Sequence, residues 1–250
     1  MQRSLEILVV AKANLTELRQ TLQSIPRGLD GVSVLICHCD IPTEHVRELA
    51  AVSLKGLPIR AFEQQTIGLY PAMNELLEKS TGDLIFFLNS GDFFVPEVAD
   101  ILEAIACLPS TDASYIFDTH QRWRGTTYIR SSAQQMRTES YQNLAHQAGW
   151  FDGKAARVIR FEETKLVIAD RIWVEAVLES CNAIYVQKPI AIHELGGVSN
   201  YPTMKTVKYR YKDGGLSELI KESIKLCMRL LVGSDRYYWL MNLRQLARRR

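Results

Sequence analysis

Apolar runs and amphipathic stretches alternate along the first 107 residues of the chain. Residues 5–11 form a nearly unbroken apolar run, which is typical of a strand buried on both faces of a sheet. The stretch that follows repeats leucines at helical spacing and stops at Pro26. The same pattern predicts further strands at 32–37, 58–62 and 84–88, and further helices that begin at residues 42, 68 and 96. This alternation predicts crossover connections and a mainly parallel central sheet in an α/β fold.

The carboxyl ends of the predicted parallel strands are expected to meet at one edge of the sheet. The strands are followed by residues 11–14, 38–40, 62–65 and 89–92. Open α/β sheets bind their ligands in the crevice outside these strand ends. We therefore expect the four segments to surround one binding crevice.

The second half of the chain predicts shorter elements. These are strands at 113–118 and 125–130, a helix over 166–180 that opens near Asp170, two strands at 183–187 and 189–193 separated by Lys188-Pro189, and a glycine-bearing loop at 195–200. The sequence contains no internal repeat and no obvious linker. We expect one Rossmann-like domain over residues 1–200, with halves at 1–110 and 111–200, followed by a helical tail over 201–250.

The composition is that of an ordinary globular protein, with 47% hydrophobic and 23% charged residues. Thirty basic and 28 acidic residues give a net charge of +2, which disfavours a nucleic-acid binder. No apolar run is long enough for a membrane span, and the first residues do not resemble a signal peptide. The five cysteines show no disulfide spacing, which favours a reducing compartment and hence the cytosol.

The charge is distributed unevenly. Residues 216–250 hold eight basic and three acidic side chains, a net +5, which leaves −3 on residues 1–215. Leucines and isoleucines recur there at helical spacing, and an aromatic cluster follows at 237–239. A basic amphipathic helix with aromatic residues suits an anionic membrane interface. A helix packed on the body with a solvated basic end is the alternative, and the pattern leaves both open.

Several polar positions are candidates for chemistry. Asn89-Ser90-Gly91-Asp92 follows the apolar strand at 84–88, and its oxygens suit a divalent cation that already holds phosphates. The same residue types are also common in simple turns. Asp170, among hydrophobic residues, is either a helix N-cap or a partly desolvated base. His146, Gln147 and His193 are isolated polar residues for which a structural role is the default.

Other motifs are missing. There is no G-x-G-x-x-G after the first strand and no P-loop, so the phosphate cradles of dehydrogenases and P-loop enzymes are absent. No G-x-S-x-G elbow indicates an α/β-hydrolase. Cys37-His38-Cys39 does not have the spacing of a zinc site.

Four segments occur together in a specific order: GLYPAMNELLEKSTGDLIFFLNSGD (68–92), HQAGWF (146–151), VIAD (167–170) and ELGGVSN (194–200). This ordered set resembles the family 2 glycosyltransferases with the GT-A fold. It is most similar to the branch that includes the colanic acid biosynthesis transferases. The resemblance spans about residues 5–200.

The resemblance implies transfer of a sugar from a nucleotide-sugar donor to a saccharide acceptor, with inversion at the anomeric carbon. It implies a Mn²⁺ or Mg²⁺ ion at Asp92 and His193, and a general base at Asp170, whose pKa burial beside Trp173 would raise. Donor binding falls on Ala11, Asn14, Asp40, Gln64, Tyr70, Asn74, Asn89 and Ser90. The acceptor side and closing loop fall on His146, Gln147, Gly196, Gly197 and Ser199. A lipid-linked acceptor would give the basic tail a purpose at the cytoplasmic face of a membrane.

The sequence departs from the family pattern on the nucleotide side. Cys39 stands at the place of the base-reading aspartate, with Asp40 one residue later. Pro71 replaces the aspartate of the family's Y-D-A-M-N motif, and Lys12 replaces a small polar or aromatic residue. These changes point to an unusual donor pocket in an active enzyme. They also leave open a degenerate member that binds a nucleotide or glycan without turnover. A nucleotidyltransferase is disfavoured because residues 10–20 contain no glycine.

Overall fold

The structure is a computed structural model that describes residues 3–108, 112–141, 144–195 and 201–247, with side chains as far as Leu243. The strands are β1 Leu5–Lys12, β2 Val32–Cys39, β3 Ile59–Glu63, β4 Leu84–Phe87, β5 Phe93–Phe94, β6 Ala113–Trp123, β7 Thr126–Arg130, β8 Gly149–Asp152 and β9 Asn182–Glu194. The helices are α1 Leu15–Gln23, α2 Thr43–Ser53, α3 Leu69–Lys79, α4 Val98–Cys107, α5 Ala133–Arg137, the 3₁₀ helix η2 His146–Ala148, α6 Gly153–Val158, α7 Ala169–Glu179, α8 Met204–Val232 and α9 Ser234–Ala247.

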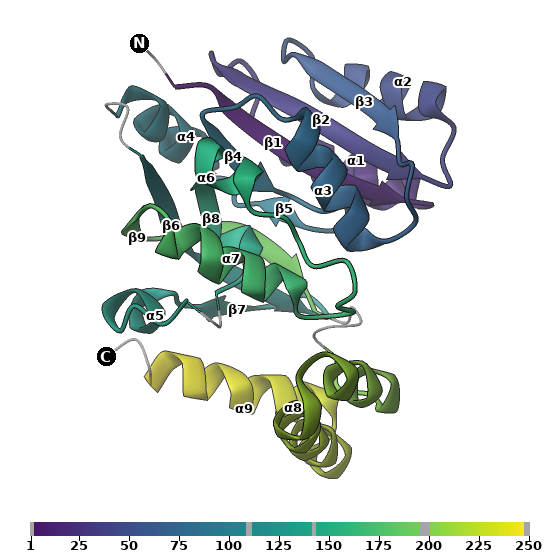
Figure 1. Ribbon diagram of the computed structural model, residues 1–250, viewed down its shortest axis with the longest axis vertical. Helices are drawn as coiled ribbons and strands as arrows, with labels where there is room; N and C mark the ends of the chain where they lie inside the picture. The colour runs from purple at the N-terminus through teal and green to yellow at the C-terminus, as the bar shows by residue number, and fades with distance from the viewer. Residues whose placement is uncertain (1–2, 109–111, 142–143, 196–200, 248–250) are drawn as a thin grey trace.

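The described residues form one nine-stranded sheet that runs through the molecule (Figure 1). Its strand order is β3-β2-β1-β4-β8-β6-β9-β5, with β7 paired to β6. The pairings give β1, β2, β3, β4, β6 and β9 the same direction, and β5, β7 and β8 the opposite one. The predicted α/β fold with a mainly parallel central sheet and a C-terminal helical tail is confirmed.

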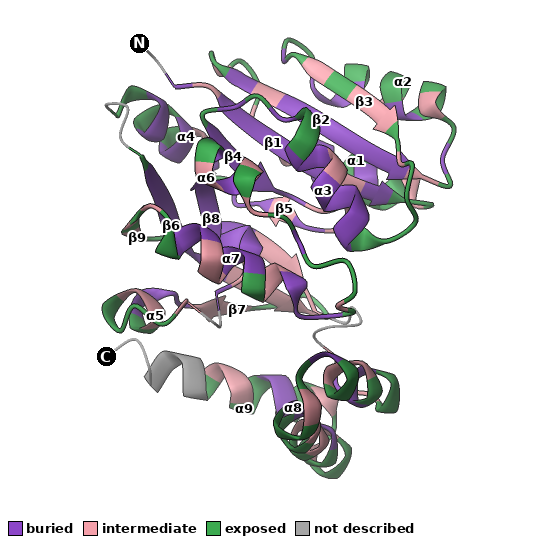
Figure 2. Ribbon diagram, viewed as in Figure 1, coloured by how far each residue is buried: buried purple, intermediate pink, exposed green. Residues whose placement is uncertain are grey.

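The two faces of the sheet bury separate hydrophobic clusters. Ile7 and Val9 of β1 point into the cluster beneath α1, α2 and α4, while Leu8 points into the one beneath α3, α6 and α7. Figure 2 shows β1 and β2 as almost continuously buried. Each fully buried large apolar side chain contributes about 1.5–3 kcal/mol to the free energy of folding. The helices packed on both faces therefore stabilise the sheet, and with it the strand ends that carry the site.

The predicted break at Lys188-Pro189 is wrong. β9 continues through it and pairs with β6 in parallel on both sides. Phe117 is opposite Val186, and the next residue of β6, Asp118, is already opposite Pro189, so the irregularity is a bulge. A bulge accommodates a proline, which has no N–H for the ladder.

The hairpin of β6 and β7 is longer than predicted. β6 extends to Trp123, five residues past the predicted end at 118, and turns at Arg124 and Gly125 with φ of 46° and 82°. The sequence also did not predict β5, β8, α5 and α6, which are two to six residues long. Such short elements form because neighbouring strands and helices hold them, so they leave little periodic pattern.

The C-terminal helices pack beneath the hairpin. α8 is interrupted at Gly215, whose φ of 69° and ψ of −153° are not helical. Tyr238 of α9 packs on Trp123, with ring centroids 4.6 Å apart, and the Trp123 indole donates to Asp235 at 2.7 Å. Tyr237 and Tyr238 are both buried, so these two aromatic residues of the tail serve packing. Among the described residues, no helix combines the length and apolarity that a membrane span needs.

Candidate active site

A cavity of about 590 Å³ opens beyond the carboxyl end of β4. It is bordered by the turn after β4, by η2, by the first turn of α7 and by the end of β9. The residues that the sequence analysis named and that line it are Tyr70, Asn89, Ser90, Asp92, His146, Gln147, Asp170 and His193. Residues from both halves of the chain therefore meet at one site.

The turn after β4 is fixed by backbone contacts. The Ser90 N–H donates to the Val10 carbonyl at 2.9 Å, and the Asp92 N–H donates to the Asn89 carbonyl at 2.9 Å. Gly91 adopts a φ of 98°, in the region that favours glycine. This turn directs the Asp92 side chain into the cavity, where it is 5% exposed.

The Asp92 carboxylate has a partner on each oxygen. His193 Nδ1 lies 2.7 Å from Oδ1, and Gln147 Nε2 donates to Oδ2 at 2.9 Å. Burial alone would raise the pKa of Asp92, but the charge and hydrogen bond of His193 and the Gln147 bond outweigh it, so this pKa is lowered. Burial lowers the pKa of His193, and the Asp92 carboxylate more than compensates, so that pKa is raised. Each group of the pair therefore favours the charged form of the other.

Asp170 lies in the first turn of α7 and faces the same cavity. The N-cap of α7 is Ile168, and no side chain caps it, so the helix-cap alternative for Asp170 is wrong. His146 Nδ1 lies 3.3 Å from Asp170 Oδ2, and the Tyr70 hydroxyl donates to Oδ1 at 3.5 Å. The Asn89 amide donates to His146 Nε2 at 3.2 Å, which leaves Nδ1 as the nitrogen that donates to Asp170. One chain of hydrogen bonds thus links Asn89 to Tyr70.

The pKa of Asp170 is lowered, not raised as the sequence led us to expect. Burial does push this pKa upward. The hydrogen bond from His146, the Arg171 backbone N–H and the Arg210 charge together outweigh it. The backbone N–H groups at the start of α7 favour a negative charge in the same way. Asp170 is therefore an ionised carboxylate at neutral pH.

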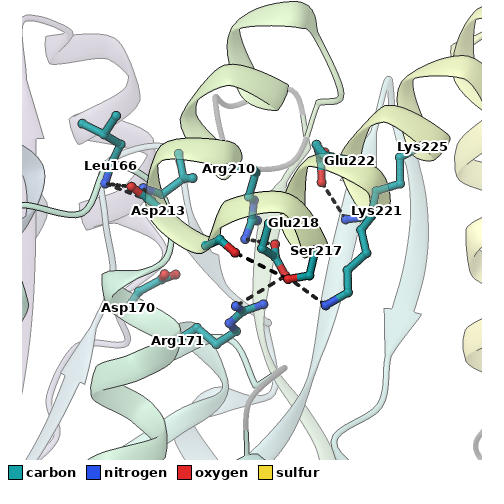
Figure 3. Close-up of polar contacts among 12 residues, drawn as sticks. Leu166, Asp170, Arg171, Arg210, Asp213, Ser217, Glu218, Lys221, Glu222 and Lys225 are labelled. Carbon is teal, nitrogen blue, oxygen red and sulfur yellow. Dashed lines mark hydrogen bonds and ion pairs between the residues drawn. The ribbon is translucent and has the colours of Figure 1, made fainter.

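The C-terminal helix α8 holds the segment that carries Asp170 (Figure 3). The Asp213 carboxylate accepts from the Leu166 N–H at 2.9 Å and from the Val167 N–H at 2.7 Å. Glu218 of α8 forms ion pairs with Arg171 at 3.9 Å, Arg210 at 3.7 Å and Lys221 at 3.1 Å. Sequence reasoning missed Asp213 because its contacts lie 46 and 47 residues away, beyond any local pattern.

The residues beside Asp92 fit a divalent cation that is shared with phosphate groups. Within the described part of the chain, Asn89 Oδ1 and Ser90 Oγ are buried without a hydrogen-bond partner. No group of three or more His, Cys, Asp or Glu side chains among the described residues could hold a metal ion by itself. Mg²⁺ and Mn²⁺ commonly bind through one or two carboxylates and complete their shell with substrate phosphates. The site has the oxygen donors for that arrangement.

Two residues expected to bind the donor have their side chains engaged elsewhere. Asn14 caps α1, and its Oδ1 accepts from the Thr16 and Glu17 backbone N–H groups at 3.1 Å each. Asn74 is buried and exchanges two hydrogen bonds with the Phe161 backbone, at 3.0 and 2.8 Å. Neither lines the cavity.

Three more of these residues also lie outside the cavity lining. Ala11 is buried at the end of β1. Asp40 is exposed, with a φ of 59°, and lies 3.9 Å from Lys12. Gln64 donates to the Gly68 carbonyl at 2.6 Å and braces the loop before α3. Gly196, Gly197 and Ser199, expected in a closing loop, lie outside the described residues.

The rim of the cavity carries an ion pair that the sequence did not reveal. Arg122 and Glu194 pair across β6 and β9, and the Arg122 guanidinium lies 4.9 Å from the centre of the Phe93 ring. All three residues line the cavity. The sequence analysis missed this pair because it ended the strand at residue 118. β6 in fact extends to Trp123 and so brings Arg122 to the site.

Comparison with solved structures shows which proteins share the fold. The chain matches S. aureus TarS with a TM-score of 0.59 and 14% identity over 89% of this chain and 43% of TarS, so it spans less than half of that protein. It matches TarS 1–349 in complex with UDP-GlcNAc with a TM-score of 0.59 and 12% identity over 88% and 72% of the two chains. It matches the mannosyltransferase PcManGT from Pyrobaculum calidifontis, in complex with GDP-Man and Mn²⁺, with a TM-score of 0.57 and 12% identity over 96% and 79%.

These likenesses establish a glycosyltransferase fold for the chain. At such identities they establish the fold alone. No protein-family model matches the sequence, and no curated protein matches it either.

Proposed function

We propose that the protein is an inverting glycosyltransferase of family 2, similar to the colanic acid branch, which moves a sugar from a nucleotide-sugar donor to a saccharide acceptor. One observation carries this proposal. Asp92 and Asp170 line the same cavity, each with its own hydrogen-bond partners, in a fold whose solved examples include complexes with UDP-GlcNAc and GDP-Man.

The donor side is the turn at 89–92. Asp92, Asn89 and Ser90, with His193 as a neutral imidazole, would hold a Mn²⁺ or Mg²⁺ ion together with the donor diphosphate. The cation supplies charge neutralisation of the leaving nucleoside diphosphate. Gln147 holds the Asp92 carboxylate by its bond to Oδ2, and so fixes the direction in which this carboxylate faces. Tyr70 lines the same cavity and would contact the donor.

The acceptor side is Asp170. Its carboxylate would accept the proton of the attacking hydroxyl, which becomes acidic as its oxygen bonds to the anomeric carbon. Attack from the face opposite the leaving group breaks the glycosyl–phosphate bond and inverts the configuration. His146 and Tyr70 hold the two carboxylate oxygens and orient them. The His146 bond also favours the ionised form of Asp170.

The proposal assigns a role to each part of the chain. Residues 1–110 would bind the nucleotide sugar, residues 111–200 the acceptor, and residues 201–250 form the helical tail. We propose a lipid-linked saccharide as the acceptor, in the synthesis of a cell-surface or exported polysaccharide at the cytoplasmic face of the membrane. The basic tail, with a net +5 over residues 216–250, supports this placement.

Replacement of Asp170 tests the chemistry directly. We expect Asp170→Asn to lower turnover by about two to four orders of magnitude, because the hydroxyl loses its proton acceptor. Donor binding, measured by calorimetry, is expected to remain. Release of nucleoside diphosphate is the readout, with membrane extract as the source of acceptor. Asp100→Asn, at an exposed carboxylate on α4, is the matched control and keeps full activity. Near-normal turnover of Asp170→Asn would exclude this carboxylate as the base.

A second candidate function is binding of a nucleotide or glycan without turnover. It is motivated by Cys39, Asp40 and Pro71 on the nucleotide side. Calorimetry that detects nucleotide binding, with no consumption of donor by the wild-type protein, would favour it.

A further inference from the structure

The second half of α8 has its polar and apolar faces reversed with respect to the body. Glu218 and Glu222 face inward and are 7% and 2% exposed. Several apolar side chains face outward, among them Leu230 at 67% exposure. We call four of them the α8 stripe: Leu216, Ile220, Ile224 and Leu231, with exposures of 65%, 52%, 55% and 85%. Their spacing of four, four and seven residues keeps them on one side of the helix. The stripe is about 22 Å long at 1.5 Å per residue.

The orientation of this helix is set by ion pairs. Glu218 is held by Arg171, Arg210 and Lys221, and Glu222 by Lys225 at 2.9 Å. Arg171 lies on α7 and Arg210 lies before the interruption at Gly215, so turning the second half of α8 over would remove the Glu218 carboxylate from both. Lys221 and Lys225 belong to the same helical segment and would turn with it. The stripe is therefore committed to face away from the body, and a contiguous exposed apolar surface of this kind marks an interaction site.

Charge identifies what covers the stripe. Residues 204–250 contain 12 basic and four acidic side chains, a net +8, so the rest of the chain carries −6. Lys205, Lys208 and Lys212 are exposed on α8 itself. A symmetric dimer through the stripe would bring two such positive regions together. An anionic lipid surface attracts the basic side chains and accepts the apolar ones.

We infer that the α8 stripe lies in the interfacial layer of an anionic membrane, with the second half of α8 parallel to the surface. This assigns lipid contact to α8 and not to Tyr237 and Tyr238, which are buried. The inference stands on exposure and charge. Its consequence for catalysis rests on the proposed function. Glu218, on the face of the second half of α8 opposite the stripe, pairs with Arg171 next to Asp170, so a lipid-linked acceptor would reach a cavity close to the surface.

The test is binding of the full chain to vesicles. Vesicles of phosphatidylglycerol and phosphatidylcholine are compared with vesicles of phosphatidylcholine alone, by co-sedimentation at low salt. We expect the wild type to bind the anionic vesicles, and to release as salt is raised. Ile220→Ser with Ile224→Ser should weaken binding by about tenfold or more, since each removes apolar area from the interface. Val52→Ser with Val158→Ser, at exposed valines on α2 and α6, is the matched control and binds like the wild type.

Three results would overturn the inference. These are no binding of the wild type at low salt, equal binding by the stripe variant, and a concentration-dependent dimer that the stripe variant loses, which would mean that a second copy covers the stripe. Leu231→Ser, at the most exposed position, serves if the double variant does not fold. Calorimetry with nucleotide sugars tests the proposed function without any lipid, so the failure of one claim is distinguishable from the failure of the other.

Discussion

At the scale of single residues, the protonation state of Asp170 depends on His146. The imidazole donates through Nδ1 while Nε2 accepts from Asn89. The largest lowering influences on the pKa of Asp170 come from His146, against a burial effect that acts upward. A carboxylate without this partner would keep the burial effect and lose much of the compensation.

Removal of the imidazole should therefore shift the pH dependence of turnover. We expect His146→Phe to raise the pKa of Asp170, so that activity on the acid side is lost at a higher pH than in the wild type. The sign follows because a raised pKa protonates the base sooner as the pH falls. The measurement is turnover at saturating substrate against pH. His45→Phe, at an exposed histidine on α2, leaves the profile unchanged. An acid limb that does not move in His146→Phe would contradict the role of His146.

Some of the candidate residues named from the sequence line the cavity, and others do not. Asp92 and Asp170 were found because each follows or joins an apolar stretch, and both line the cavity. Asn14 and Asn74 were named by resemblance, yet their side chains cap a helix and hold a backbone segment. The direction of the Asp170 pKa could not be predicted, because it depends on His146 and Arg210, which are 24 and 40 positions away in the chain.

At the scale of elements, α8 and the start of α7 are joined by Asp213. Its carboxylate accepts backbone N–H groups from Leu166 and Val167 and is 8% exposed. These N–H groups precede the helix that carries Asp170 and have no place in its own ladder. The contact therefore links the tail to the position of the proposed base.

Loss of that contact should affect stability and turnover together. Asp213→Ala leaves two backbone N–H groups without their acceptor, and we expect it to lower the free energy of unfolding by about 2–4 kcal/mol. We also expect a lower kcat with little change in the donor Kd, because Asp170 moves while the 89–92 turn does not. Denaturant unfolding and steady-state kinetics are the measurements. Glu222→Gln, on the same helix but paired with Lys225, serves as control and keeps its kcat. An unchanged kcat in Asp213→Ala would contradict the link.

The sequence predicted those helices and strands whose hydrophobic pattern continues over many residues. β1, α2 and α3 have full apolar patterns and begin within a residue of their predicted starts. β8 is only four residues long and lies between β4 and β6 in the sheet. Its strand conformation depends on pairing with these two neighbours. The continuity of β9 through Pro189 depends on pairing with β6, which no local pattern reports.

At the scale of the whole molecule, the chain separates into an acidic body and a basic pair of helices, with −6 and +8 on the two sides of residue 204. The fold class followed from the alternation of strands and helices alone. The helical spacing of leucines and isoleucines also predicted the helical tail. It did not predict that the apolar face of α8 would point away from the body. That reversal arises because Arg171 and Arg210 attract Glu218 inward. The contact with Arg171 exists only in the folded body, so no local sequence pattern reports it.

The cavity beside Asp92 and Asp170 is proposed to bind a nucleotide sugar together with a divalent cation. Thermal unfolding with UDP-, GDP- and dTDP-linked sugars, each with and without Mn²⁺, tests it most directly. A ligand at about 100 times its Kd adds about 2.7 kcal/mol, which shifts the melting temperature visibly. We predict a Mn²⁺-dependent rise with one nucleotide class, which Asp170→Asn retains and Asp92→Asn loses. No rise with any donor, or a rise that Asp92→Asn keeps in full, would contradict the account.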